Sequence, residues 1–165
     1  MRNFGGMATS RLNRNLRLEK HWSYGTSGGV SGARGPRSFI VVAPVQTDRT
    51  REVMKEIRGV AGARPLVGEE YDSIMRSQVA RLPGRFETLD ALVSAAVDHV
   101  NTGRAPEYYY DYAQNLQALD PAALAEAGKV VKPEELVWVV IGDLKKIEAG
   151  VRELGYGEAV RAQVE

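Results

Sequence analysis

Apolar residues recur at helical spacing along most of the chain. The sharpest example is residues 87–101, where one face of a helix would carry Leu89, Leu92, Val93, Ala96, Val97 and Val100. These positions fall at intervals of three and four, so they align along one stripe of a 3.6-residue helix. The stripe predicts a helix that packs into the core.

Shorter stretches of the same spacing predict further helices. They cover residues 9–20, 47–59, 67–81, 106–119, 120–131 and 144–154. Thr9 or Ser10 would cap the first of them, and Thr47 with Asp48 would cap the second. Asp120 followed by Pro121 is the sequence of an N-cap and first helical residue, and Gly155 is suited to end the last helix.

Two stretches predict strands rather than helices. Residues 39–45 are β-branched and nearly all apolar, and they follow a Gly35-Pro36 turn and a glycine-rich segment, 23–35. We expect these two segments to form a hairpin. The apolar run Leu136–Ile141 is the strongest in the chain and predicts a central strand.

This order of elements favours an α+β fold. Strands and helices do not alternate evenly and no repeat is present, so we expect a largely antiparallel sheet with helices packed on one face. The length, 165 residues, suits a single domain, 1–165. Three strands are few for so many helices, which suggests that one strand of the sheet is missing.

The composition excludes several classes of function. Hydrophobic residues make up 44% and charged residues 26%, and no apolar run is long enough to cross a membrane. Without cysteine, the chain has no disulfides, thiolate ligands or thiol nucleophiles. The first residues lack the apolar stretch of a secretory signal, and the compartment stays open between cytoplasm and periplasm.

Positive charge gathers at the N-terminal end. Residues 1–37 hold seven Lys or Arg and one Glu, whereas the remainder holds fifteen Lys or Arg and twenty Asp or Glu. A nucleic-acid-binding domain is therefore one reading. However, Arg11, Arg14, Arg17 and Lys20 recur every three residues and would spread around a helix, so a solvated face is favoured over a phosphate-tracking stripe.

Familiar catalytic motifs are missing. His21 and His99 are far apart and belong to no H-x-x-E-H or H-E-x-x-H helix, so the sequence predicts no zinc site of its own. The glycine-rich segment lacks the Lys-Ser/Thr end of a phosphate loop. The tyrosines of residues 108–112 have acidic neighbours, which indicates aromatic packing rather than base stacking.

The remaining candidate chemistry lies at residues 16–25. A short amphipathic helix there would deliver Trp22 and Tyr24 into the glycine-rich segment. Arg17 and Tyr24, seven residues apart, could then face one site, which is a geometry for holding a ligand.

The same stretch carries a resemblance to a known family. Gly5-Gly6-Met7-Ala8-Thr9-Ser10-Arg11-Leu12, Asn15 to Lys20 and Trp22-Ser23-Tyr24-Gly25 resemble the C-terminal half of the pitrilysin/insulinase-type zinc peptidases, the inverzincins related to mitochondrial processing peptidase. The resemblance continues through Gln46-Thr47-Asp48, residues 82–88, Tyr108 to Tyr112, Val139 to Asp143 and Leu154-Gly155. It departs at His21-Trp22, where the family often has Lys-Gly or Gly-Tyr.

The resemblance implies a substrate-binding half without catalytic or metal residues of its own. In the family, two related halves close on each other; one carries zinc on an inverted H-x-x-E-H motif, and the other supplies an Arg and a Tyr that contact substrate. The matching residues here are Arg17 and Tyr24. A Tyr hydroxyl can donate to a developing oxyanion and an Arg fork can bind peptide carbonyls.

The partners implied are a zinc-bearing half-domain or subunit and an extended peptide substrate, with no nucleic acid and no membrane. The chain alone would be inactive, with no cofactor of its own and zinc in the partner half. The resemblance also implies a domain lacking its first strand, so we expect self-association to cover the exposed edge. The alternatives are a structural subunit of the same fold without a proteolytic role and, less favoured, the basic nucleic-acid-binding domain.

Overall fold

The computed structural model describes residues 10–31, 35–61 and 65–162. They divide into two compact units. The first, called the site unit, comprises the described residues of 10–28, 41–61 and 130–162, and it holds the N-terminal helix, helix α2 and the last helix. The second, called the helical unit, comprises the described residues of 29–40 and 65–129. Each strand of the hairpin is divided between the two units. Over these residues, no helix is both long and apolar enough to cross a membrane. The prediction of one domain over 1–165 stays a prediction.

The N-terminal helix of the site unit changes its winding after one turn. It begins as α1 (Arg11–Asn13) and continues as a π-helix, η1 (Arg14–Glu19). Leu12 and Leu16 are fully buried, which confirms the predicted apolar face. Ser10 has extended backbone at the N-cap, whereas the other predicted cap, Thr9, lies outside the described residues together with the Gly5-Gly6 part of the family resemblance.

Helix α2 supplies the rest of this small core. A 3-10 turn, η2 (Thr47–Arg49), leads into α2 (Thr50–Ala61), which runs two residues past the predicted end at Gly59. Val53 and Ile57, one turn apart, are buried. Glu56 bonds to the N-terminal helix: its carboxylate accepts a hydrogen bond from Asn15.

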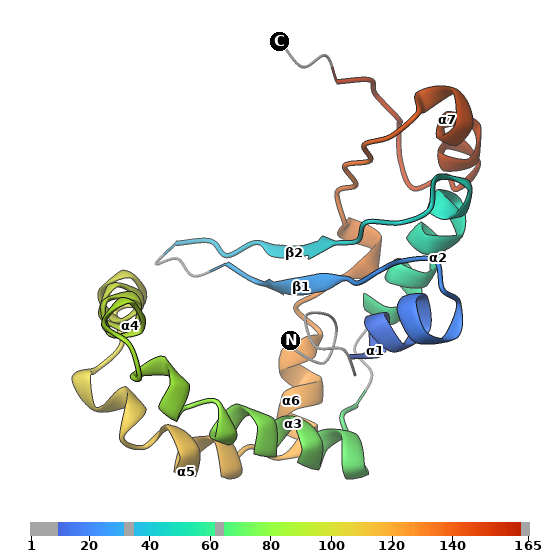
Figure 1. Cartoon of the computed structure of the whole chain (residues 1–165). Coiled ribbons are helices and arrows are strands. Elements are labelled where there is room, and N and C mark those ends of the chain that lie inside the picture. The colour runs from blue at the N-terminus through green and yellow to red at the C-terminus, as the bar shows by residue number, and fades with distance from the viewer. Residues whose placement is uncertain (1–9, 32–34, 62–64, 163–165) are drawn as a thin grey trace. The chain divides into compact units, whose positions relative to one another are not determined.

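The last helix packs on α2 (Figure 1). Helix α7 (Leu144–Glu153) begins where predicted: the Asp143 carboxylate caps it by accepting from the amide of Lys145, 3.2 Å away, and Gly155 ends it with a left-handed φ of 62°. Ile147 is buried, and Arg51 of α2 forms an ion pair with Glu153 at 2.5 Å. A 3-10 turn, η5 (Pro133–Glu135), also contacts α2.

The predicted hairpin is confirmed but short. Strands β1 (Ser27–Val30) and β2 (Phe39–Val42) form an antiparallel two-stranded sheet (Figure 1). The amide of Ser31 donates to the carbonyl of Ser38, which continues the pairing past the strand ends. At the other end, Ser23 and Val45 form an isolated antiparallel bridge.

The prediction of a central strand at Leu136–Ile141 was wrong. These residues form no helix or ladder: Leu136 has extended backbone, with φ −67° and ψ 130°, but no backbone hydrogen bond joins the run to another segment that the structure describes. A strand exists only when a second strand pairs with it, and this apolar run has no such partner here. The described sheet therefore has two strands, not the larger antiparallel sheet that we expected.

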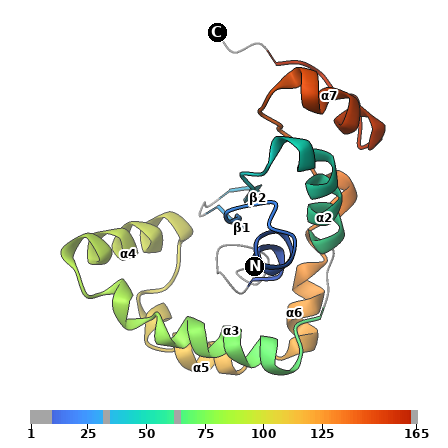
Figure 2. The ribbon, with the colours of Figure 1, turned by 45° about the vertical axis from the view of Figure 1, so that its right-hand side comes forward.

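The helical unit is built from short helices and tight turns. Its elements are α3 (Gly68–Ala80), η3 (Pro83–Arg85), α4 (Leu89–Thr102), η4 (Pro106–Tyr109), α5 (Tyr112–Gln117) and α6 (Pro121–Gly128). Helices α3 and α5 lie side by side (Figure 2), and the hydroxyl of Tyr71 donates to the carbonyl of Leu119. Asp120 caps α6 as predicted, accepting from the amide of Ala123 at 2.7 Å.

Three helix predictions need correction in this unit. The helix predicted over 106–119 is broken between η4 and α5, and α6 ends at Gly128 rather than near Val131. The apolar stripe of α4 was predicted to be core, yet its leucines and valines are exposed; only Ala95 of this helix is buried. The tyrosines do pack together, since the Tyr109 ring lies 5.4 Å from Phe86 and 6.3 Å from Tyr112.

Candidate functional site

The wide turns of η1 shape the start of the candidate site. The amide of Lys20 donates to the carbonyl of Asn15 at 3.0 Å, one residue farther back than in an α-helix. The amides of Trp22 and Ser23 then both donate to the carbonyl of Leu16, at 2.8 and 3.2 Å. This doubled contact ends the helix and turns the chain sharply into the segment that carries Tyr24.

The turn forces one residue into an unusual conformation. His21 has a φ of 56°, the only positive φ outside glycine within the described residues. Left-handed backbone is uncommon for residues with a Cβ, although histidine adopts it more readily than most. The carbonyl of His21 accepts from the Gln46 side chain at 3.2 Å, so the segment before η2 helps to hold the turn.

A buried side-chain amide fastens the segment beyond Tyr24. Asn13 is 4% exposed, and its Oδ1 accepts from the backbone amide of Thr26 at 2.6 Å and from the Thr26 hydroxyl at 3.0 Å. Its Nδ2 donates to the Thr26 carbonyl at 3.1 Å. The side chain of Asn13 thus pairs with Thr26 as a neighbouring strand would.

Ser23 fastens the segment on the other side of Tyr24. Its hydroxyl donates to the carbonyl of Pro44 at 2.6 Å and accepts from the amide of Gly25 at 3.2 Å. The amide of Gln46 donates to the carbonyl of Trp22 at 3.0 Å. The chain just before Tyr24 is therefore bonded to the segment 44–46, and Ser23 also holds the residue just after Tyr24.

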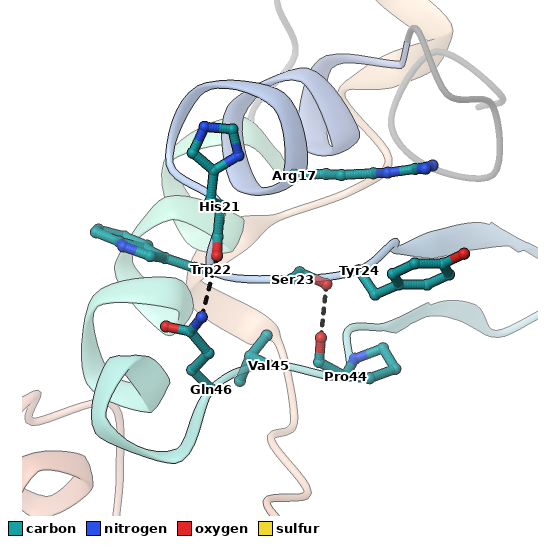
Figure 3. A pocket seen from close by; sticks show the side chains of 8 residues that line it. All are labelled: Arg17, His21, Trp22, Ser23, Tyr24, Pro44, Val45 and Gln46. Atoms are coloured by element: carbon teal, nitrogen blue, oxygen red, sulfur yellow. Dashed lines mark hydrogen bonds between the residues drawn. The ribbon is translucent and has the colours of Figure 1, made fainter.

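An open hollow of about 590 Å³ lies over this framework. Its lining is Arg17, His21, Trp22, Ser23, Tyr24, Pro44, Val45 and Gln46. Arg17 and Tyr24 extend in the same direction while Trp22 extends the opposite way (Figure 3). The Arg17 guanidinium carbon lies 5.2 Å from the centre of the Tyr24 ring, within cation–π range.

The structure thus brings together the two residues singled out from the sequence. Tyr24 is 89% exposed, so its ring and hydroxyl are open to a ligand. None of the eight lining residues carries a carboxylate, whereas Arg17 brings a guanidinium and His21 an imidazole. The hollow is therefore suited to acceptor groups such as peptide carbonyls, carboxylates or developing oxyanions.

Trp22 forms the other end of the hollow and is flanked by cations. The ammonium of Lys20 lies 4.8 Å and the guanidinium carbon of Arg49 5.8 Å from the Trp22 ring centre. Both cations also have acidic partners, because Lys20 pairs with Glu56 and Arg49 with Asp48. These contacts hold the indole in place.

Glu56 ties α2 to the helix that carries Arg17. Its burial raises the pKa of the carboxyl, but the hydrogen bonds from Lys20 and Asn15 and the charge of Lys20 outweigh burial and leave that pKa below its usual value. A carboxyl whose pKa is lowered on folding stabilises the fold above its unfolded pKa. That contribution is lost as the pH falls through the folded pKa.

We therefore expect Glu56→Gln to lower the free energy of unfolding by about 1 kcal/mol at neutral pH, because the charged hydrogen bonds are lost. The difference from wild type should shrink as the pH falls below the ordinary glutamate pKa of about 4.3, and it should vanish once the pH is below the lowered pKa of the folded state, where the wild-type carboxyl is protonated too. Urea unfolding at a series of pH values measures both effects. Glu126→Gln, which removes an exposed pair with Lys129, is the control and should change little; equal losses for Glu56→Gln at acid and neutral pH would contradict the assignment.

Sequence reasoning did not find Asn13, Ser23 or Thr26 as site residues. A signal for the first was present, since an asparagine one residue after Leu12 and three before Leu16 is a poor helix former at a position next to the buried face. Among the described residues, no three His, Asp or Glu side chains lie together as a metal site requires. His99 instead lies 6.2 Å from the Tyr109 ring in the helical unit.

Comparison with known proteins identifies the fold. A crystal structure of a peptidase M16 inactive domain from Pseudomonas fluorescens superposes with a TM-score of 0.69 and 15% sequence identity. The match covers 79% of this chain and 32% of that one, so the chain spans about a third of its length. The chain has the M16-like fold over the matched part. No protein-family model matches the sequence, and no curated protein matches it.

Proposed function

We propose that this chain is the substrate-binding, non-catalytic half of a zinc-dependent metallopeptidase. The structural likeness to a peptidase inactive domain and the sequence resemblance to the C-terminal half of a zinc peptidase both support a non-catalytic half. The observation that carries the proposal is the placement of Arg17 beside Tyr24 over an open hollow. Both side chains extend from a backbone that buried hydrogen bonds hold in place.

The ligand proposed is an extended peptide. Its backbone offers carbonyl acceptors at regular intervals, and the five N–H donors of Arg17 can bind two of them or a carboxylate. The exposed hydroxyl of Tyr24 can donate to an oxygen that gains negative charge during hydrolysis. Because no lining residue is acidic, no carboxylate of the hollow competes with the peptide for these donors.

The proposed partner is a zinc-bearing half-domain or subunit that supplies the hydrolytic chemistry. Zinc would be held by that half, since the described residues of this chain bring no three ligands together. The role left to this chain is to bind and orient the peptide against the partner, and the chain alone is then inactive. Two halves that close on an extended peptide would exclude water from it.

Nuclear magnetic resonance tests the binding role at the level of single residues. We expect reduced and carboxymethylated lactalbumin, a permanently unfolded polypeptide, to shift the amide signals of residues 17–26, Val45 and Gln46. Arg17→Ala and Tyr24→Phe should each weaken binding about tenfold, the value of one good hydrogen bond.

Two matched controls sharpen this test. Arg14→Ala removes an exposed arginine outside the hollow, and Tyr110→Phe alters a tyrosine that is 88% exposed in the helical unit. Neither should change affinity. Shifts confined to other residues, or equal affinities for all four variants, would contradict the proposal and favour a structural subunit of the same fold.

We also propose that copies of this chain associate when the partner half is absent. The extended run Leu136–Ile141 keeps the alternation of a strand, with Trp138 packed 5.8 Å from Tyr156 and Val137, Val139 and Ile141 exposed. Its backbone forms no ladder with other described residues. An apolar, unpaired extended segment is a ready template for strand pairing.

A further inference from the structure

We propose that Asn13 is a positioning residue that sets the geometry of the Arg17–Tyr24 pair. This inference rests on the proposed peptide-binding role of that pair. Asn13 lies on the helix that carries Arg17, four residues earlier, and its side chain bonds to Thr26, two residues after Tyr24. A single buried amide therefore joins the two segments from which the pair extends.

The contact is unusually complete for one side chain. Asn13 accepts two hydrogen bonds at Oδ1 and donates one from Nδ2, and all three go to Thr26. Both residues are buried, at 4% and 6% exposure. Breaking the contact would leave the amide and carbonyl of Thr26 without this partner in a dry environment, so an alternative position of the segment is disfavoured.

The Asn13–Thr26 contact helps to fix the position of Tyr24, because the exposed Tyr24 ring packs little against the protein. The ring is exposed, and the backbone is held on one side by Ser23 bonded to Pro44 and on the other by Thr26 bonded to Asn13. With both sides fixed, the remaining freedom of Tyr24 is rotation of its side chain. The ring then stays within reach of the Arg17 guanidinium without a ligand to hold it.

The chemistry of this position is specific to asparagine. Pairing with a backbone amide and carbonyl requires an acceptor and a donor on one planar group, which leucine lacks and aspartate offers only in part when charged. Glutamine has the same group but a longer stem, which would push Thr26 away. We therefore expect Asn13→Leu to release the segment, and Asn13→Asp, which keeps both accepted bonds, to have an intermediate effect.

The test reads the Arg17–Tyr24 contact directly and without ligand. In wild type the Tyr24 ring should shift the side-chain proton signals of Arg17 upfield through its ring current, and Tyr24→Leu defines the signal without that ring. Asn13→Leu should abolish most of the shift and weaken binding of carboxymethylated lactalbumin about tenfold. Asn13→Asp should lose part of each.

A stability control separates positioning from general weakening of the fold. Ile57→Val shortens a buried side chain on α2 and lowers stability while leaving the side chains of Asn13 and Thr26 and their hydrogen bonds intact, so it should leave the ring-current shift and the affinity unchanged. If Asn13→Leu does not fold, Thr26→Val, which removes the hydroxyl donor, should reduce the shift in the same direction as Asn13→Asp.

The outcomes are distinguishable. A lost ring-current shift in Asn13→Leu with an unchanged shift in Ile57→Val supports the inference, whether or not a peptide binds. An unchanged shift and affinity in Asn13→Leu, or in both Asn13→Asp and Thr26→Val, overturns it. If Arg17→Ala binds the polypeptide as wild type does while the ring-current result stands, the proposed function has failed and the positioning role has not.

Discussion

Leu16→Ala is expected to lower the free energy of unfolding by about 3 kcal/mol, a large effect for a single truncation in the site unit. Leu16 is fully buried, and it lies on the π-helix between Asn13 and Arg17. Removing three side-chain carbons leaves a cavity at this fully buried position, because neighbours in a packed core close such gaps only partly.

Leu16 also holds the turn that leads to the candidate site. Its carbonyl accepts the amides of Trp22 and Ser23, so movement of its backbone into the cavity would move the turn that leads to Tyr24. We expect the variant to lose peptide affinity as well as stability. A loss of about 3 kcal/mol corresponds to a melting temperature lower by roughly 6 to 12 °C for a chain of this size.

Thermal and urea unfolding measure the effect, and Leu18→Ala is the matched control. Leu18 lies on the same π-helix but is 52% exposed, so its truncation should cost well under about 1 kcal/mol. Comparable losses for the two variants would mean that the helix does not pack on its Leu12 and Leu16 face.

Short-range features of this fold were predictable because their causes are local. The caps at Asp120 and Asp143 and the stop at Gly155 depend on neighbours within four residues, and all three are present in the structure. The hairpin is also local, since only eight residues separate its two strands in the sequence. The site pair Arg17 and Tyr24 lies within eight residues, so its proximity could be predicted from the sequence.

Features that depend on distant partners were not predictable in the same way. The run Leu136–Ile141 has the composition of a central strand, yet a strand forms only where another edge is available. Likewise, the stripe on α4 has core spacing, but spacing does not say what covers it, and its valines are exposed. In both cases the pattern correctly identified an apolar surface, but the predicted burial of that surface was wrong.

The supporting residues of the site were missed for a third reason. Asn13 is polar and would be assigned to the solvent side of a helix, whereas the structure buries it because its amide replaces a strand partner for Thr26. The π-helix was also unforeseen, because the spacing of Leu12 and Leu16 fits an ordinary α-helix equally well. Wide turns are set by how the helix ends, and here the end is held by segment 44–46.

Val139→Lys is expected to weaken self-association about a hundredfold. Val139 is 83% exposed on the unpaired extended run, and covering a valine side chain contributes roughly 1.5 kcal/mol or more. In a symmetric dimer the residue is covered twice, which doubles the contribution to about 3 kcal/mol. Lysine at the centre of an open strand also opposes edge-to-edge pairing by bringing like charges together.

Sedimentation equilibrium over a wide range of concentrations measures the dissociation constants, and Val130→Lys serves as the control. Val130 is also exposed but lies before η5, outside the extended run, so its charge should leave association as in wild type. A wild-type chain that stays monomeric at every concentration would remove the proposal, and equal weakening by both variants would move the interface elsewhere. If Val139→Lys alone dissociates, the run Leu136–Ile141 is the interface between copies of the chain.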